Sequence, residues 1–321
     1  MKKKNILVFF LVICIAVLAF GIGVSAQAFR VALIMPSTIN DFAWSQSMYD
    51  SLIAVQNEMG KDNFQFVYSE NMFVVADAAA AIRDYASEGY DLVIAHGSQY
   101  GASLVDIAPD FPNTSFVWGS TVNIFADQGI TNVFAYETAA EESGYVNGVL
   151  AAKLSKSDIL GVVGPIETGD AKRYTAGFKA GVMATKPNAK VNVTWIGSYS
   201  DVALASEAAQ THINAGADVL TGTAQMVVGA VGVARQRGAL WFGYDVDQAA
   251  LAPQTVVCSV IVDWVVALKP MIEKIMKGER GGTIFTLTLA NGGLKIVVNQ
   301  EALVGKTIED IIKGDIKVKV E

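Results

Sequence analysis

Three residues near the start of the chain carry side chains that could hold a flat, polar ligand. They are Asp41, Phe42 and Trp44, within the segment INDFAWSQSMYDSL at residues 39–52. Aromatic rings stack on flat ligands, and a carboxylate accepts hydrogen bonds from ligand N–H or hydroxyl groups. Structural roles are also open, because Asp41 suits a helix N-cap and Trp44 shares an apolar helix stripe with Met48. Phe42 has no comparable structural explanation, because a turn residue need not be aromatic. We therefore predict a ligand-binding loop here.

Other candidate ligand contacts follow apolar, strand-like runs. Asp245 ends the run LWFGY, and we expect it to face a cleft because an unpaired carboxylate is costly to bury. Trp118 ends FVWGS, where it serves either a ligand site or packing between lobes. Further candidates at equivalent turns are Tyr174, Thr223 and Gln225, and Ser198 or Tyr199 lies nearer the strand end than Trp195.

Catalytic motifs are absent from the sequence. It contains no G-x-S-x-G, no G-x-G-x-x-G after the first strand-like run, and no G-x-x-x-x-G-K-[ST]. Its two histidines, His96 and His212, are far apart and have no Cys or His neighbours. We therefore expect ordinary polar histidines, no metal site, no cofactor and no enzyme activity.

The elements that position these residues alternate between strand and helix. Short β-branched runs between helical segments are typical of buried parallel strands. The pattern also repeats: Gly89 and Asp91 in YASEGYDLVIA match Gly216 and Asp218 in HINAGADVLTG. The sequence therefore predicts an α/β protein of two Rossmann-like lobes, whose strand ends face each other across a ligand cleft.

We place the lobe boundaries from this repeat. The N-terminal lobe is predicted at residues 27–135 plus 260–280, and the C-terminal lobe at 136–259 plus 281–321. The chain would cross between lobes near 133–140, near 258–259 and after GERGG. The late strands TIFTLTLA and LKIVVN are expected to extend the second lobe.

Residues 1–26 have the pattern of a secretory signal peptide. A basic start, MKKKN, precedes an apolar run and small residues, which predicts cleavage near Ala26 or Ala28. An uncleaved membrane anchor is the alternative. Cleavage would change the net charge from −7 to −10 and leave Cys258 as the single cysteine, with no internal disulfide. Such an acidic exported protein is a poor nucleic-acid binder, and we expect a monomer.

Several longer motifs resemble the basic membrane protein (BMP) family of ABC-transporter substrate-binding proteins, many of which bind purine nucleosides. The motifs are SGYVNGVLAAKLSKSDILGVVG, RYTAGFKAG and GYDVDQ, in that order. The resemblance implies a type I periplasmic-binding fold, with two lobes joined by a three-strand hinge. It also implies ligand contacts at Asp41, at Phe42 or Trp44, at Tyr174 and at Asp245.

The chain departs from the nucleoside binders of that family at two places. Ser98 and Gln99 stand where those proteins have an acid, and Val262, followed by Asp263, stands where they have a lysine. The resemblance therefore implies a periplasmic or cell-surface protein that hands a small solute, flat and nucleoside- or nucleobase-like, to inner-membrane permease subunits. A ligand sensor that presents a solute to a membrane receptor is the alternative, and an exported α/β enzyme is a further one.

Overall fold

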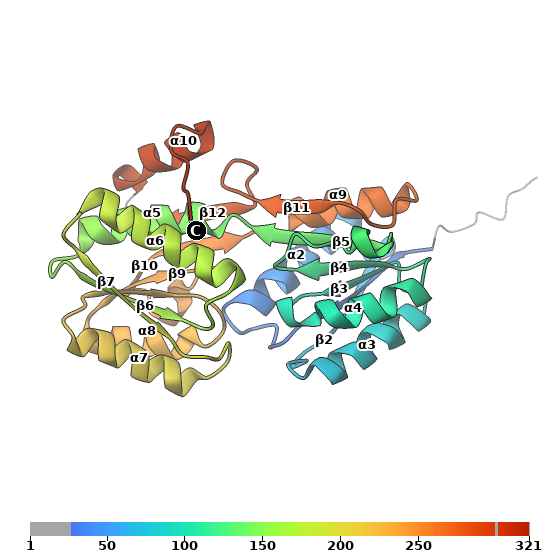
Figure 1. Cartoon of the computed structure of the whole chain (residues 1–321), viewed down its shortest axis with the longest axis horizontal. Coiled ribbons are helices and arrows are strands. Elements are labelled where there is room, and N and C mark those ends of the chain that lie inside the picture. The colour runs from blue at the N-terminus through green and yellow to red at the C-terminus, as the bar shows by residue number, and fades with distance from the viewer. Residues whose placement is uncertain (1–26, 299–300, 321) are drawn as a thin grey trace, which may run out of the picture.

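The computed structural model describes residues 27–298 and 301–320, and these residues form two six-stranded sheets (Figure 1). The predicted signal peptide lies outside the described residues. The first sheet is wholly parallel and has the order β11-β5-β4-β3-β1-β2. Its strands are β1 (Phe29–Ile34), β2 (Phe64–Ser69), β3 (Leu92–Ala95), β4 (Ser115–Gly119), β5 (Val133–Thr138) and β11 (Ile284–Leu287).

The second sheet repeats this order as β12-β10-β9-β8-β6-β7, with β12 antiparallel to β10. Its strands are β6 (Ile159–Gly164), β7 (Lys190–Trp195), β8 (Val219–Gly222), β9 (Leu240–Gly243), β10 (Val256–Val262) and β12 (Leu294–Val298). The predicted pair of parallel α/β lobes is confirmed.

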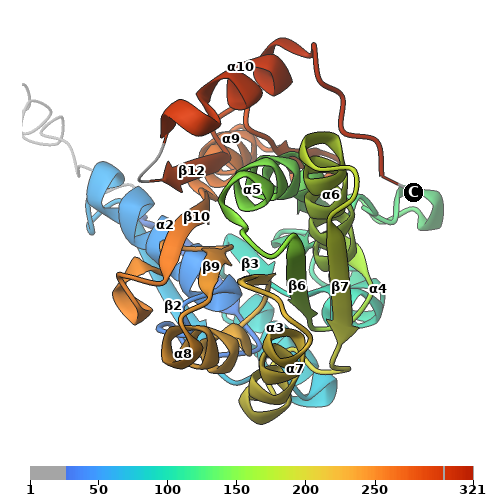
Figure 2. The ribbon, with the colours of Figure 1, turned by 90° about the vertical axis from the view of Figure 1, so that its left-hand side faces the viewer.

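Helices cover both faces of each sheet because the central strands are apolar on both sides. In β1, Val31 and Leu33 pack toward α2 and α9, whereas Ala32 and Ile34 pack toward α3 and α4. The second sheet lies between α5 and α6 on one face and α7 and α8 on the other (Figure 2). The helices are α2 (Trp44–Met59), α3 (Val75–Ser87), α4 (Gly101–Ile107), α5 (Ala140–Leu154), α6 (Gly169–Thr185), α7 (Val202–Asn214), α8 (Val227–Arg237), α9 (Val265–Met276) and α10 (Gly305–Lys313).

The repeated sequence pattern corresponds to a repeated local structure. Gly89 follows α3 and Gly216 follows α7, and both have the left-handed backbone that glycine favours, with φ of +74° and +96°. Asp91 then accepts a hydrogen bond from the backbone N–H of Arg30, and Asp218 holds the turn before β6 in the same way. Each aspartate thus fixes the entry into a central strand of its sheet.

The lobe boundaries that follow from the strand pairing differ from the predicted ones. Within the described residues the chain passes between sheets three times, after β5, after β10 and after β11. The predicted limits at 135/136 and 259/260 fall inside β5 and β10. The prediction for TIFTLTLA was wrong: β11 pairs with β5 in the first sheet. A short β-branched strand carries no sequence mark of which sheet edge it joins.

We call the first sheet with α2, α3, α4 and α9 the first lobe, and the second sheet with α5–α8 and α10 the second lobe. Helix α9 returns to the first lobe through Trp264, whose backbone N–H and Nε1 donate to the hydroxyls of Ser51 and Ser47 on α2. The buried thiol of Cys258 on β10 donates to Asn147 of α5, as expected for a structural cysteine.

Candidate functional site

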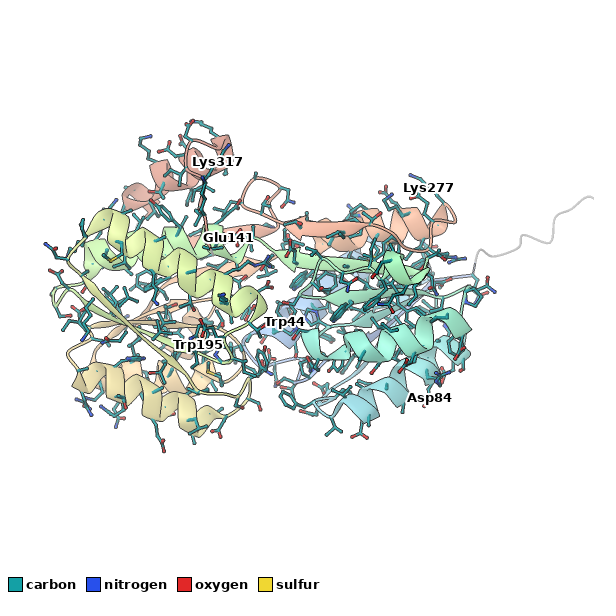
Figure 3. The ribbon with its side chains drawn as sticks, viewed as in Figure 1. Trp44, Asp84, Glu141, Trp195, Lys277 and Lys317 are labelled. Atoms are coloured by element: carbon teal, nitrogen blue, oxygen red, sulfur yellow. The ribbon has the colours of Figure 1, made fainter. Side chains whose placement is uncertain are left out.

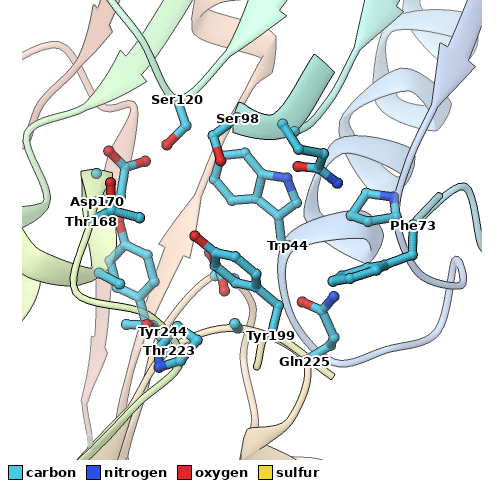
Figure 4. A pocket seen from close by; sticks show the side chains of 18 residues that line it. Trp44, Phe73, Ser98, Ser120, Thr168, Asp170, Tyr199, Thr223, Gln225 and Tyr244 are labelled. Atoms are coloured by element: carbon cyan, nitrogen blue, oxygen red, sulfur yellow. The ribbon is translucent and has the colours of Figure 1, made fainter. Parts of the chain in front are cut away.

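A cavity lies between the lobes at the carboxyl ends of the strands (Figure 4). The empty space there, part of it open to solvent, amounts to about 660 Å³. Every lining residue belongs to a segment that follows one of the parallel strands, as the rule for such sheets requires. The lining residues are Pro36, Trp44, Phe73, Gly97, Ser98, Gln99, Ser120, Pro165, Thr168, Gly169, Asp170, Ala171, Tyr199, Thr223, Ala224, Gln225, Tyr244 and Asp245.

Trp44 borders the cavity from the first lobe and is held by a neutral histidine. Its ring stacks on His96 with centroids 4.3 Å apart, and its Nε1 donates to the His96 carbonyl. Because the Trp44 carbonyl can only accept, His96 Nε2 donates to it, and Nδ1 accepts from the Tyr136 hydroxyl. Burial lowers the pKa of His96 to about 3, so the ring is uncharged at neutral pH. His96, expected to be an ordinary polar residue, orients Trp44.

The turn at Asp41 and Phe42 organises the start of α2. The Asp41 carboxylate accepts hydrogen bonds from three backbone N–H groups of that first turn, at 2.9–3.2 Å. Phe42 has a left-handed backbone with φ of +54°, and its carbonyl accepts a hydrogen bond from Gln248 of the second lobe. Both side chains lie outside the cavity. Asp41 therefore has a structural role, because its hydrogen bonds stabilise the start of α2.

Asp245 enters the cavity directly after β9. Its φ of +82° is unusual for a residue other than glycine, and such conformations cluster at functional sites. The residue is 2% exposed, and Oδ1 lacks a hydrogen-bond partner among the described residues. Burial raises the pKa of Asp245 well above its usual range, and the nearby charges of Asp41 and Asp170 raise it further. This oxygen is therefore available to a ligand donor.

Asp170, in the first turn of α6, is a second buried carboxylate at the cavity. Its Oδ1 accepts from Arg173 at 2.6 Å, and the same guanidinium pairs with Glu137 of β5 and lies 3.8 Å from Glu141. Burial raises the pKa of Asp170, and Arg173 offsets part of this shift. One arginine thus serves three carboxylates at the junction of the lobes.

Aromatic rings border the cavity from both lobes. Trp44 and Phe73 come from the first lobe, and Tyr199 and Tyr244 come from the second (Figure 4). The Tyr199 hydroxyl faces that of Ser98 in the other lobe. A flat ligand between the lobes would therefore meet an aromatic surface on either side.

The structure brings some of the predicted site residues together and separates others. The predicted residues that line the cavity are Trp44, Ser98, Gln99, Tyr199, Thr223, Gln225 and Asp245. The residues that lie elsewhere are Asp41, Phe42, Trp118, Tyr174 and Asp263.

Each of the separated residues has a structural partner. Trp118 donates a hydrogen bond through Nε1 to the Gly97 carbonyl, and its ring stacks on Phe125. Tyr174 is fully buried one layer behind Tyr244, where its hydroxyl bonds with Asn147 and Thr221. Asp263 accepts a hydrogen bond at the start of α9, pairs with Lys295 and lines a second cleft against α2, which shares Asp245 with the cavity.

The residues that sequence reasoning missed include Phe73, Ser120, Asp170 and Tyr244. Ser120 and Tyr244 directly follow β4 and β9, so the strand-end rule applied to every strand would have found them. Phe73 and Asp170 follow longer loops. Asp170 in TGDAKRY has the pattern of an exposed helix start, and only the lobe packing buries it.

A family sequence profile matches nearly all of the described chain. The family is described as ABC transporter substrate-binding protein PnrA-like (Bmp), and the match covers residues 28–321. This chain belongs to that family. The chain is thus an ABC-transporter solute-binding protein, and the family's partners are a small molecule and a permease. Membership favours transport over the sensor and exported-enzyme alternatives.

Individual relatives are similar over most of their length. This chain is 29% identical over 251 residues to a purine-binding protein of Brucella abortus (strain 2308), and the match covers 77% of this chain and 70% of that one. It is 28% identical over 308 residues to the ABC transporter nucleoside-binding protein BmpA of Lactococcus lactis subsp. cremoris (strain MG1363), covering 87% and 86%.

A solved structure gives the same fold. The ABC transporter solute-binding protein of Aeropyrum pernix K1 superimposes with a TM-score of 0.76 at 20% identity, covering 91% of this chain and 94% of that one. Within the described residues of this chain, no helix is both long and apolar enough to cross a membrane.

Proposed function

We propose that this protein binds a flat heterocyclic solute, nucleoside- or nucleobase-like, between its lobes and delivers it to the permease of an ABC importer. The observation that carries the proposal is the buried, unpaired Oδ1 of Asp245 in a cavity bordered by aromatic rings from both lobes. Rings gain from stacking on such walls, and a ligand hydroxyl or N–H group supplies the partner that the carboxylate lacks.

The relatives support a nucleoside-like ligand, because two of them are named for binding purines or nucleosides. Ser98 and Gln99 offer hydrogen bonds from the loop where nucleoside binders of the family carry an acid. We therefore expect a heterocycle of this general shape with altered polar contacts on the first-lobe side.

Delivery requires the lobes to close on the solute, as in other hinged binding proteins. The bond from Gln248 to the Phe42 carbonyl joins the lobes, and Ser98 and Tyr199 approach each other from opposite lobes at the cavity. We propose that solute binding favours this closed arrangement and that the closed form docks on the permease. The protein would act as an exported monomer, in the periplasm or at the cell surface.

Calorimetric titration of cavity variants tests the proposal. A thermal-shift screen of the chain from Gln27 onward against nucleosides, nucleobases, flavins, sugars and amino acids supplies the ligand. Trp44→Ala and Asp245→Ala should each weaken its binding by about tenfold or more, or about 1.4 kcal/mol.

Asp263→Asn is the matched control, because Asp263 lies outside the cavity. Its affinity should equal that of the wild type. Equal affinity in Trp44→Ala and Asp245→Ala, with both variants folded, would remove this cavity as the binding site.

A further inference from the structure

The charged side chains that line the cavity all carry one sign. They are Asp170 and Asp245, and among the described residues no lysine, arginine or histidine lines the cavity with them. The two aspartates are 7% and 2% exposed, so water screens their charges poorly.

Both carboxylates keep one oxygen available. Asp245 Oδ1 and Asp170 Oδ2 lack partners of hydrogen-bond geometry in the described part of the chain. The hydroxyls of Ser120 and Thr138 lie beside Asp170, and the Ala224 backbone N–H lies beside Asp245, yet these groups leave the two oxygens unpaired. Buried acceptors of this kind are costly unless a ligand satisfies them.

Nearby cationic charge does not balance the pair. Arg173 contacts Asp170, but it is shared with Glu137 and Glu141 and lies behind the cavity wall. His96, behind Trp44, is uncharged at neutral pH because burial lowers its pKa. The two aspartates therefore disfavour each other's charged form, and a cation beside them would stabilise that form.

The aromatic walls add to this preference. The face of an aromatic ring is electron-rich and attracts a cation, most strongly where water is excluded. Trp44 and Tyr244 are held in place by hydrogen bonds to His96 and Thr138, so both rings are ordered before a ligand arrives. Tyr199 and Phe73 complete the border of the cavity.

We infer that the solute is a flat heterocycle with a positive charge, bound with that charge near Asp170 and Asp245, in preference to neutral or anionic analogues. The inference rests on the proposed function, since it assumes that a flat heterocycle enters this cavity. A cation there is attracted by both buried carboxylates, whereas a phosphorylated ligand is repelled by both.

A pair of isomeric nucleosides tests the charge preference. 1-Methyladenosine has a protonated base at neutral pH, and N6-methyladenosine is its neutral isomer; nicotinamide riboside and inosine form a second cationic and neutral pair. Calorimetric titration should show the cationic member of at least one pair binding about tenfold tighter or more. Adenosine 5′-monophosphate should bind more weakly than either adenosine derivative.

Two variants test whether the preference for a cationic ligand arises from these aspartates. Asp170→Asn and Asp245→Asn should each reduce the ratio of cationic to neutral affinity by about tenfold. Asp245→Asn protects the test against misfolding, because it replaces a carboxyl group whose charged form is already disfavoured. Asp84→Asn is the control: it removes the same charge from an exposed position on α3, away from Trp44 and the cavity (Figure 3), and should leave the ratio unchanged.

The outcomes separate the two proposals. If the neutral nucleosides bind as tightly as the cationic ones, the charge inference is overturned while the proposed function stands. If the cationic preference survives both aspartate variants in folded protein, the charge lies elsewhere and the inference also fails. If no nucleoside, charged or neutral, binds the wild-type chain, the nucleoside-like function fails and the inference falls with it.

Discussion

At the scale of single residues, Trp44 shows how a ligand surface is fixed in place. Its indole is pinned by His96 on one face and meets Trp264 edge-on. The bond to the Trp44 carbonyl requires a proton on His96 Nε2, and burial keeps the imidazole uncharged because it lowers the pKa to about 3. The wall of the cavity therefore depends on a histidine that stays neutral.

The neutral histidine predicts a pH-dependent stability. His96 has a pKa of about 3 in the folded protein, against an ordinary value of 6.5. Between pH 3 and pH 6.5, the unfolded chain therefore binds a proton at His96 and the folded chain does not. His96 therefore stabilises the fold fully above pH 6.5, and this contribution declines by up to about 1.4 kcal/mol per pH unit as pH falls. His96→Gln should be less stable than wild type at pH 7, with the gap narrowing toward about pH 4.5.

Denaturant unfolding at several pH values measures that gap. Tyr136→Phe is the control, because it removes the hydroxyl bonded to His96 but leaves the titrating ring. Its stability difference from wild type should change much less with pH. A His96→Gln gap that stays constant across the range would mean that His96 does not resist protonation in the folded protein.

At the scale of elements, the close contact of α5 and α6 builds the acidic end of the cavity. The helices cross at glycines spaced four apart, Gly144 and Gly148 on α5 and Gly177 and Gly181 on α6. A Cβ atom at Gly148 would stand 2.1 Å from the Phe178 carbonyl oxygen. These glycines let the backbones touch, and this contact carries Glu141 of α5 to the arginine that holds Asp170.

A pair of glycine variants tests this contact. Gly148→Ala should lower the free energy of unfolding by about 2 kcal/mol or more, because the backbones must separate. Gly232→Ala, in the interior of α8 with open space around it, should raise stability by about 0.5–1 kcal/mol through helix propensity. Thermal and denaturant unfolding compare the two, and a neutral Gly148→Ala would contradict the close packing.

At the scale of the whole molecule, the sequence predicts the two-lobed architecture because its signals are local. The helix stop at Gly89 and its copy at Gly216 mark equivalent turns in both lobes, and apolar runs mark the buried strands. The edge position of β11 could not be predicted, because its partner is set by where α9 returns the chain.

The candidate site, like the fold, could be predicted only in part from the sequence. Asp245 and Trp44 stand out because a carboxylate or a large ring at a strand end has few structural uses. Tyr174 has the same signal but lies one helix turn deeper, behind Tyr244. Asp170 could not be recognised as a cavity residue, because its burial depends on the contact between the two lobes. The local sequence does not reveal that contact.

A crystal structure of the chain grown with the heterocycle that gives the largest thermal shift tests the central claim most directly. We predict electron density for the heterocycle between the lobes, with its ring against Trp44 and a donor group within hydrogen-bond distance of Asp245 Oδ1. Density for the ligand at any other surface, with this cavity holding only solvent, would contradict the account.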